Sequence, residues 1–215
     1  MKTYDLSAAL RVYVILDPEK LREDTSLMEV AQQVLQAGAR VIQLRNKRDS
    51  ARTTITQARQ LVTLCEQYDA LFIMNDRVDL ALAAHAHGVH VGPEDMPVDL
   101  VKEIAPDLIV GASSGSVESA LDNVQRGADY LGVGAIFEAR QSKPDASAPR
   151  GLQVVRDIRE ALGSAFPFVG IGGITRDNAR SVVDAGADGV AMIRAITAQA
   201  DPAHEVGVLI HALDD

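Results

Sequence analysis

Eight short apolar segments alternate with helix-length segments along the chain of 215 residues, and this alternation limits the possible folds severely. We predict strands at residues 12–16, 41–44, 71–74, 89–91, 108–110, 130–133, 168–171 and 190–193. Apolar residues recur at helical spacing between them, as at Ile55, Ala58, Leu61, Val62 and Cys65. Strands separated by helices predict a parallel sheet with helices packed on its faces.

The joints between helix and strand repeat as well. Glycine precedes an alanine at Gly38, Gly127 and Gly186, and His87-Gly88 is a shorter version of the same joint. Glycine there supplies the left-handed residue that ends a helix. Ser26, Ser116 and Thr175 stand where helices should begin, as N-caps. Eight such units predict an α/β fold, a single (β/α)8 TIM barrel; the alternative is an open doubly wound sheet.

Composition supports one domain over residues 1–215, because no linker or low-complexity tract interrupts the pattern. Only 4% of the residues are aromatic, so the core must be aliphatic. The only cysteine is Cys65 and no apolar run is long enough to span a membrane, so we expect a cytoplasmic protein without a membrane partner. The sequence does not decide between a monomer and a homo-oligomer.

The formal net charge of −9 at pH 7 argues against a nucleic-acid partner. If the substrate is anionic, the basic residues must gather at one place against the average field. The active site of a (β/α)8 barrel lies at the carboxyl ends of its strands. The polar residues and glycines at these ends are Gln43, Arg45, Lys47, Asn75, Asp76, Arg77, Gly92, Asp95, Ser113, Ser142, Lys143, Gly172, Gly173 and Arg194.

The Gly172–Gly173 turn and Arg194 follow the last two strands. Loops after these strands are the usual phosphate site of the fold, and glycine lets backbone amides approach an anion. We therefore expect phosphorylated small molecules as substrates. The alternative is that the two glycines form only a tight turn.

Asp76 and Asp95 follow neighbouring strands and predict a site for a hard cation such as Mg2+, which commonly takes one or two carboxylates. Two alternatives are a general acid–base pair and, for Asp76, the N-cap of the next helix. His85, His87 and His90 match no common metal-binding spacing; we expect His90 to point into the barrel.

Several motifs together resemble the thiamine phosphate synthase family. Gln43-Leu44-Arg45-Asn46-Lys47 is similar to its Q-L-R-(E/D)-K, and Asn75-Asp76-Arg77 to its N-D-R. Residues 88–92 followed by Asp95 resemble G-V-H-(L/I)-G-Q-x-D, and similarity continues through Gly132-Val133-Gly134, Ile171-Gly172-Gly173-Ile174 and Gly189-Val190-Ala191. In order, these motifs cover nearly the whole chain.

The resemblance implies an enzyme, a transferase that joins hydroxymethylpyrimidine diphosphate to a thiazole phosphate (or its carboxylate) and releases pyrophosphate. It implies that Asp76 and Asp95 hold Mg2+ and that backbone at Gly172, Gly173, Ile193 and Arg194 binds the thiazole phosphate. The residues implied around the pyrimidine diphosphate are Gln43, Arg45, Lys47, Asn75, Ser113, Ser142 and Lys143. Arg45, Lys47, Ser113 and Lys143 would carry the catalysis.

Two other functions stay open at this stage. A thiazole tautomerase of the same fold uses a histidine after the fifth strand, where this chain has Gly115, and tends to lack the aspartate found here at Asp76. A non-catalytic barrel that binds thiazole or thiamine phosphate would need the anion site but no metal. We also predict that the loop over residues 137–151 is a mobile lid that brings Ser142 and Lys143 to the diphosphate.

Overall fold

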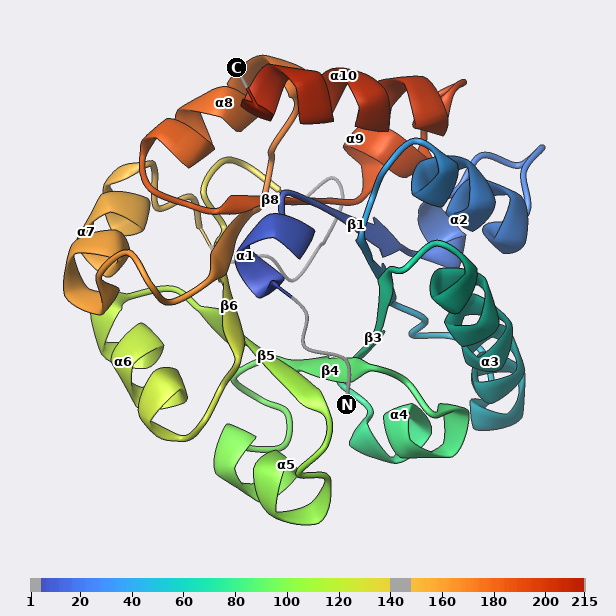
Figure 1. Cartoon of the computed structure of the whole chain (residues 1–215), viewed down its shortest axis with the longest axis horizontal. Helices are drawn as coiled ribbons and strands as arrows, with labels where there is room; N and C mark the ends of the chain where they lie inside the picture. Colours follow the sequence, from blue (N-terminus) through green and yellow to red (C-terminus); the bar gives the residue numbers. More distant parts are fainter. Residues whose placement is uncertain (1–4, 140–147, 215) are drawn as a thin grey trace.

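The structure, a computed structural model, describes residues 5–139 and 148–214. Its parallel strands form a closed barrel in which each strand pairs with its neighbours in sequence and β1 pairs with β8 (Figure 1). The strands are β1 (Val12–Leu16), β2 (Val41–Leu44), β3 (Leu71–Asn75), β4 (Gly88–Val91), β5 (Ile109–Ser114), β6 (Tyr130–Gly134), β7 (Phe168–Ile171) and β8 (Gly189–Met192). The predicted (β/α)8 barrel is confirmed.

The predicted bounds hold for β1, β2 and β7 and differ at the other strands. The largest difference is at β5, which runs on to Ser114. Its polar end pairs with β6, Ser113 with Gly132 and Ser114 with Val133. Apolar runs mark the buried part of a strand, so a strand end that carries hydroxyls is missed by that criterion.

Helices surround the barrel on its outer side (Figure 1). The helices of the described residues, including the short 3-10 helix η1, are α1 (Leu6–Ala9), η1 (Pro18–Lys20), α2 (Leu27–Gln36), α3 (Ala51–Gln67), α4 (Val78–Ala84), α5 (Val98–Ile104), α6 (Val117–Gln125), α7 (Gln153–Leu162), α8 (Arg176–Asp184), α9 (Arg194–Thr197) and α10 (Pro202–Asp214). Ser26, Ser116 and Thr175 are the N-caps of α2, α6 and α8, as predicted. Within the described residues, no helix combines the length and the apolar character that a membrane span needs.

Three of the four predicted glycine joints have the expected backbone. The left-handed glycines are Gly38 (φ 110°), Gly127 (φ 100°) and Gly186 (φ 118°). The prediction for Gly88 is wrong, because Gly88 is the first residue of β4 and His85 (φ 59°) is the left-handed residue that ends α4. Glycine at position 88 is explained by packing, since a Cβ there would lie 2.4 Å from the carbonyl oxygen of Ile109.

Two apolar clusters hold the fold together. The larger one lies between the sheet and the helices and includes Val14, Ile42 and Phe72. The smaller one fills the barrel interior with residues such as Tyr13 and Ile73, and Leu6 and Ala9 of α1 pack against it. Helix α1 lies across the centre of the strand ring in Figure 1 and precedes β1, so it covers the amino-terminal end of the barrel. The carboxyl end is left for a site.

Candidate active site

Arg45 follows β2 and is paired with a buried acid that the sequence analysis did not include. Its Nη1 donates to Oδ2 of Asp17 at 2.7 Å, and the two side chains are 12% and 1% exposed. Asp17 follows β1 directly, and the amide of Arg45 donates to the carbonyl oxygen of Leu16 at 2.9 Å. The β1–β2 pairing therefore continues up to the ion pair and fixes this cation at the rim.

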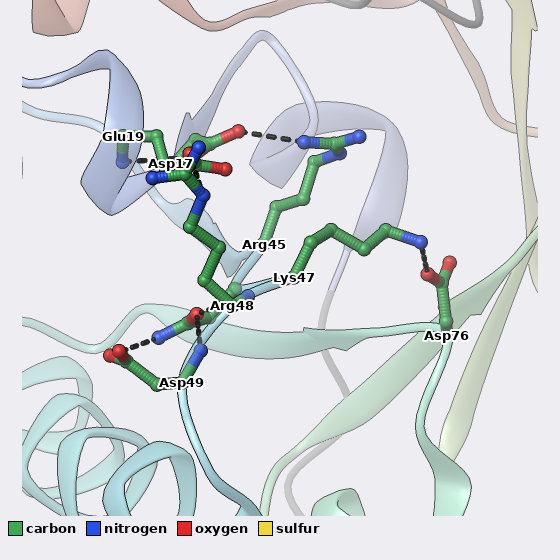
Figure 2. Close-up of polar contacts among 8 residues, drawn as sticks. Asp17, Glu19, Arg45, Lys47, Arg48, Asp49 and Asp76 are labelled. Carbon is green, nitrogen blue, oxygen red and sulfur yellow. Dashed lines mark hydrogen bonds and ion pairs between the residues drawn. The ribbon is translucent and has the colours of Figure 1, made fainter.

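Lys47 points away from Arg45, toward Asp76 (Figure 2). Its ammonium donates to Oδ2 of Asp76, which lies at the end of β3. Asn46 stands between the two cations in sequence but turns away from them, since its Nδ2 donates to Asp49 at 2.8 Å and to Gln57 of α3 at 3.0 Å. Asn46 stands where the motif it resembles has an acid, and its side chain does not face the cations of the rim.

Asp76 has a left-handed backbone (φ 60°) and its amide donates to the carbonyl oxygen of His90 at 2.8 Å. The alternative that it caps the next helix is wrong, because Arg77 is the N-cap of α4. The hydrogen bond that its amide donates to β4 instead fixes Asp76 at the rim, between β3 and β4. Asn75, the other predicted residue here, is the last residue of β3 and is half-buried.

Asp95 lies beside Asp76 and completes an acidic pair. Burial raises the pKa of the Asp95 carboxyl, and the nearby Asp76 carboxylate adds to the rise, while the amide of Gly92 and the ammonium of Lys47 oppose it. The Gly92 amide donates to Asp95 Oδ2 at 2.8 Å, which holds the side chain in a local turn. Two adjacent carboxylates with an ammonium beside them form a place where positive charge is favourable.

A divalent hard cation fits this place. Among the described residues, no group of three or more His, Cys, Asp or Glu side chains is arranged to hold a metal ion. Mg2+ needs no such group, because it binds through one or two carboxylates and keeps water and substrate phosphates as its other ligands. The donor set of Asp76 and Asp95 therefore suits Mg2+ better than a metal that requires a full protein cage.

A chain of hydrogen bonds crosses the barrel interior below the rim and joins two of the predicted residues. Gln43 Nε2 donates to the Tyr13 hydroxyl at 2.7 Å, and the Tyr13 and Tyr130 hydroxyls are 2.9 Å apart. Tyr130 is 3.1 Å from Nδ1 of His90, whose Nε2 is 3.0 Å from the Ser113 hydroxyl. Burial raises the pKa of both tyrosines, so they stay neutral. The expectation that His90 points inward is confirmed.

A pocket of about 480 Å³ opens beside this chain at the ends of β5 to β8. Ser113 belongs to the hydrogen-bond chain and to the pocket, since it contacts His90 and also lines the pocket wall. The other predicted residues on the pocket wall are Gly172, Gly173, Ile193 and Arg194. The structure thus gathers the predicted residues into two neighbouring groups, a charged rim over β1 to β4 and a pocket over β5 to β8.

The two glycines of the pocket have a structural reason of their own. Gly172 (φ 101°) and Gly173 (φ 63°) are left-handed, and a Cβ on Gly173 would lie 2.5 Å from the carbonyl oxygen of Glu138. A Cβ on Gly172 would lie 2.6 Å from the Cβ of Ala135. A side chain at either position would therefore disturb the segment after β6 before it reached any ligand.

Ser142 and Lys143 lie outside the described residues, and so does most of the predicted lid. The two ends of that loop are tied to neighbouring backbone. The amide of Phe137 donates to Gly172 and that of Arg150 to Ala135, both at 2.9 Å, although Glu138 and residues 148–150 are exposed. The mobile lid stays a prediction.

Comparison with known proteins identifies the family. Residues 12–196 match the family model described as thiamine monophosphate synthase. This chain belongs to that family. The thiamine-phosphate synthase of Pyrococcus furiosus is 44% identical over 197 residues, which cover 92% of this chain and 91% of that protein. The thiamine-phosphate synthase of Shouchella clausii is 38% identical over 206 residues, covering 95% and 97%.

Solved structures agree with the family assignment. A thiamine phosphate pyrophosphorylase from Pyrococcus furiosus superposes with a TM-score of 0.88 at 41% identity and covers 98% of both chains. A 3-hexulose-6-phosphate synthase superposes with a TM-score of 0.66 at 18% identity, which shows a shared barrel fold alone.

The buried Asp17–Arg45 pair generates a prediction about stability. Asp17→Asn keeps the side-chain volume and the oxygen that accepts from the Glu19 amide, but removes the charge facing Arg45. We expect urea unfolding to show a loss of about 1.5–3 kcal/mol, the range for a hydrogen bond to a charged group. The matched control is Asp24→Asn in the exposed Arg22–Asp24 pair, where we expect a much smaller loss because solvent screens the two charges. Equal losses in both variants would show that burial of the Asp17 pair contributes nothing.

Proposed function

We propose that this chain is a thiamine phosphate synthase, a transferase that joins hydroxymethylpyrimidine diphosphate to a thiazole phosphate and releases pyrophosphate. One observation carries the proposal. The charged rim and the pocket lie at the same end of the barrel; Ser113 lines the pocket and contacts the side chain of His90, whose carbonyl oxygen accepts from the Asp76 amide. A transferase with two phosphorylated substrates needs two such places within bonding distance of each other.

We assign the charged rim to the pyrimidine diphosphate. Arg45 and Lys47 supply positive charge there and Asn75 supplies an amide group; Gln43 lies below them, where its amide donates to Tyr13. Lys143 and Ser142 are proposed to join them on the resemblance alone. Because Asp17 holds Arg45 in place before substrate arrives, little reorientation is needed when the diphosphate binds.

We assign the pocket to the thiazole phosphate. Backbone of the Gly172–Gly173 turn and of Ile193 and Arg194 lines the wall, and Arg194 brings a cation. Main-chain amides at such a turn are suited to phosphate oxygens. Ser113 lies where the pocket meets the interior hydrogen-bond chain, so its hydroxyl is placed between the two substrates.

The reaction breaks the bond between the pyrimidine methylene carbon and the diphosphate oxygen, and the electron pair leaves with the diphosphate. The carbon, carrying carbocation character, then bonds to the thiazole nitrogen. No side chain needs to form a covalent bond with substrate. The task of Arg45, Lys47 and Lys143 is to stabilise negative charge as it develops on the leaving group. Bound at Asp76 and Asp95, Mg2+ would neutralise part of the same charge.

The tautomerase alternative is disfavoured by two residues. Gly115 stands where that activity requires a histidine, and Asp76 is present at the rim. A Cβ on Gly115 would lie 2.8 Å from the guanidinium atoms of Arg150, so a side chain at this position would displace the end of that arginine. A non-catalytic barrel that binds thiazole or thiamine phosphate would need an anion site but not the acidic pair of Asp76 and Asp95.

We further propose that residues 1–215 form this single barrel domain and that the protein works in the cytoplasm. The closed ring of strands supports the single domain. The buried Cys65, which forms no disulfide, supports a reducing compartment such as the cytoplasm.

The proposed reaction is tested by measuring pyrophosphate release. Purified protein with Mg2+, pyrimidine diphosphate and thiazole phosphate should release pyrophosphate and form thiamine phosphate in equal amounts. Omitting the thiazole phosphate should abolish product and leave at most slow release. Isomerisation of the thiazole without any pyrophosphate release would favour the tautomerase instead, and tight binding without either reaction would favour the non-catalytic barrel.

The proposed metal site is tested at Asp76. Asp76→Asn removes one negative charge, and asparagine tolerates the left-handed backbone found there. We expect kcat/KM to fall by about 100-fold or more, with the melting temperature unchanged. Asp69→Asn is the matched control, because Asp69 is also left-handed (φ 52°) but precedes β3, at the other end of the strand. Normal turnover of Asp76→Asn at saturating Mg2+ would remove Asp76 from the metal site.

A further inference from the structure

Arg150 lines the same pocket as Ser113 and Arg194, and neither the motifs nor the proposed roles include it. Its backbone is fixed by two layers of hydrogen bonds. The amide of Ile136 donates to Ile171 at the end of β7, and the amide of Arg150 donates to Ala135, both at 2.9 Å. Although Arg150 lies near the end of the long loop over residues 137–151, its Cα is therefore anchored to the strand ends that form the pocket.

The guanidinium of Arg150 occupies the space over Gly115. A Cβ built on Gly115 would lie 2.8 Å from Nε, Cζ and Nη2 of Arg150. Gly115 directly follows β5 and is not among the residues with a positive φ, so its backbone does not itself require glycine. What requires glycine here is the neighbouring arginine side chain.

The charge of this pocket is opposite to that of the chain. The net charge is −9, yet the described residues that line the pocket include Arg150 and Arg194 and no aspartate or glutamate. Within residues 5–139 and 148–214, Arg150 takes part in none of the ion pairs that hold other arginines to carboxylates. An arginine that faces a pocket and has no acidic partner among the described residues is suited to bind an anion.

We propose that Arg150 binds an anionic group of the acceptor substrate, a phosphate or a carboxylate, and that Gly115 is required because it leaves room for this guanidinium. Arg150 is thus a specificity-determining residue of the pocket, with Gly115 as its structural partner. This inference rests on the proposed function, since it takes the thiazole phosphate as the occupant of the pocket.

Calorimetric binding of thiazole phosphate, without the second substrate, tests the proposal. Arg150→Ala should weaken binding by about 10- to 100-fold, the range for a charge-assisted hydrogen bond. Arg150→Lys should restore part of the affinity. Arg156→Ala is the control, because Arg156 is an exposed arginine of α7 that does not line the pocket, and it should bind like the wild type.

Gly115→Ala provides an independent arm. The atoms it would displace are the end of a flexible side chain, so the melting temperature should hold while the affinity falls as in Arg150→Ala. In the Arg150→Ala background, adding Gly115→Ala should cause no further loss, because the guanidinium is already gone. Additive losses in the double variant would contradict the pairing of Gly115 with Arg150.

Comparing thiazole phosphate with and without its ring carboxylate identifies the group that is bound. A loss seen with both ligands assigns Arg150 to the phosphate, and a loss confined to the carboxylated ligand assigns it to the carboxylate. If wild-type protein binds both ligands and Arg150→Ala binds them equally well, the proposal is overturned. If the wild type binds neither, the proposed function fails, and the inference falls with it.

Discussion

The parallel pairing of β1 with β8 closes the barrel, and the candidate site depends on this closure. Val12, Tyr13 and Val14 pair with Val190, Ala191 and Met192. In an open sheet the ends of β1 and β8 would lie at opposite edges. In the closed ring, the charged residues after β1 to β4 and the pocket over β5 to β8 face the same opening, and the covered end with α1 is opposite. The fold thereby brings Arg45, Lys47, Arg150 and Arg194 to one end of the barrel in a chain whose net charge is negative.

Polar groups inside the barrel link its two halves. Tyr13 and Tyr130 come from β1 and β6, and their hydroxyls carry the hydrogen-bond chain from Gln43 to His90. Small residues make this possible, because a Cβ on Gly111 would lie 2.1 Å from the Tyr130 ring. Each buried hydroxyl has a partner, so the chain avoids the cost of an unsatisfied polar group. It also orients Gln43 and Ser113, two residues proposed to contact substrate.

The sequence predicted the barrel and most of the rim, since apolar strands, helical spacing and left-handed glycines are local signals. It did not reveal what depends on pairing between distant segments. Asp17 stands directly after a strand, a recognisable position, but only the folded chain shows its carboxylate buried against Arg45. Arg150 lies in a loop that has no recognisable sequence pattern. In the sequence, Gly115 is notable only as the place where a tautomerase has histidine; the structure shows that the Arg150 guanidinium lies next to it. Gly172 and Gly173 were predicted for a ligand, yet glycine is already required there because a Cβ would clash with residues 135–138.

The central claim is that the charged rim and the pocket are two separate anion sites that are filled together. Calorimetric titration of pyrophosphate with Mg2+, in the absence and presence of saturating thiazole phosphate, tests it directly. The account predicts that one pyrophosphate binds per chain in both titrations and that thiazole phosphate does not weaken its binding. Loss of pyrophosphate affinity in proportion to the thiazole phosphate concentration would show that both anions compete for one site, and would contradict the account.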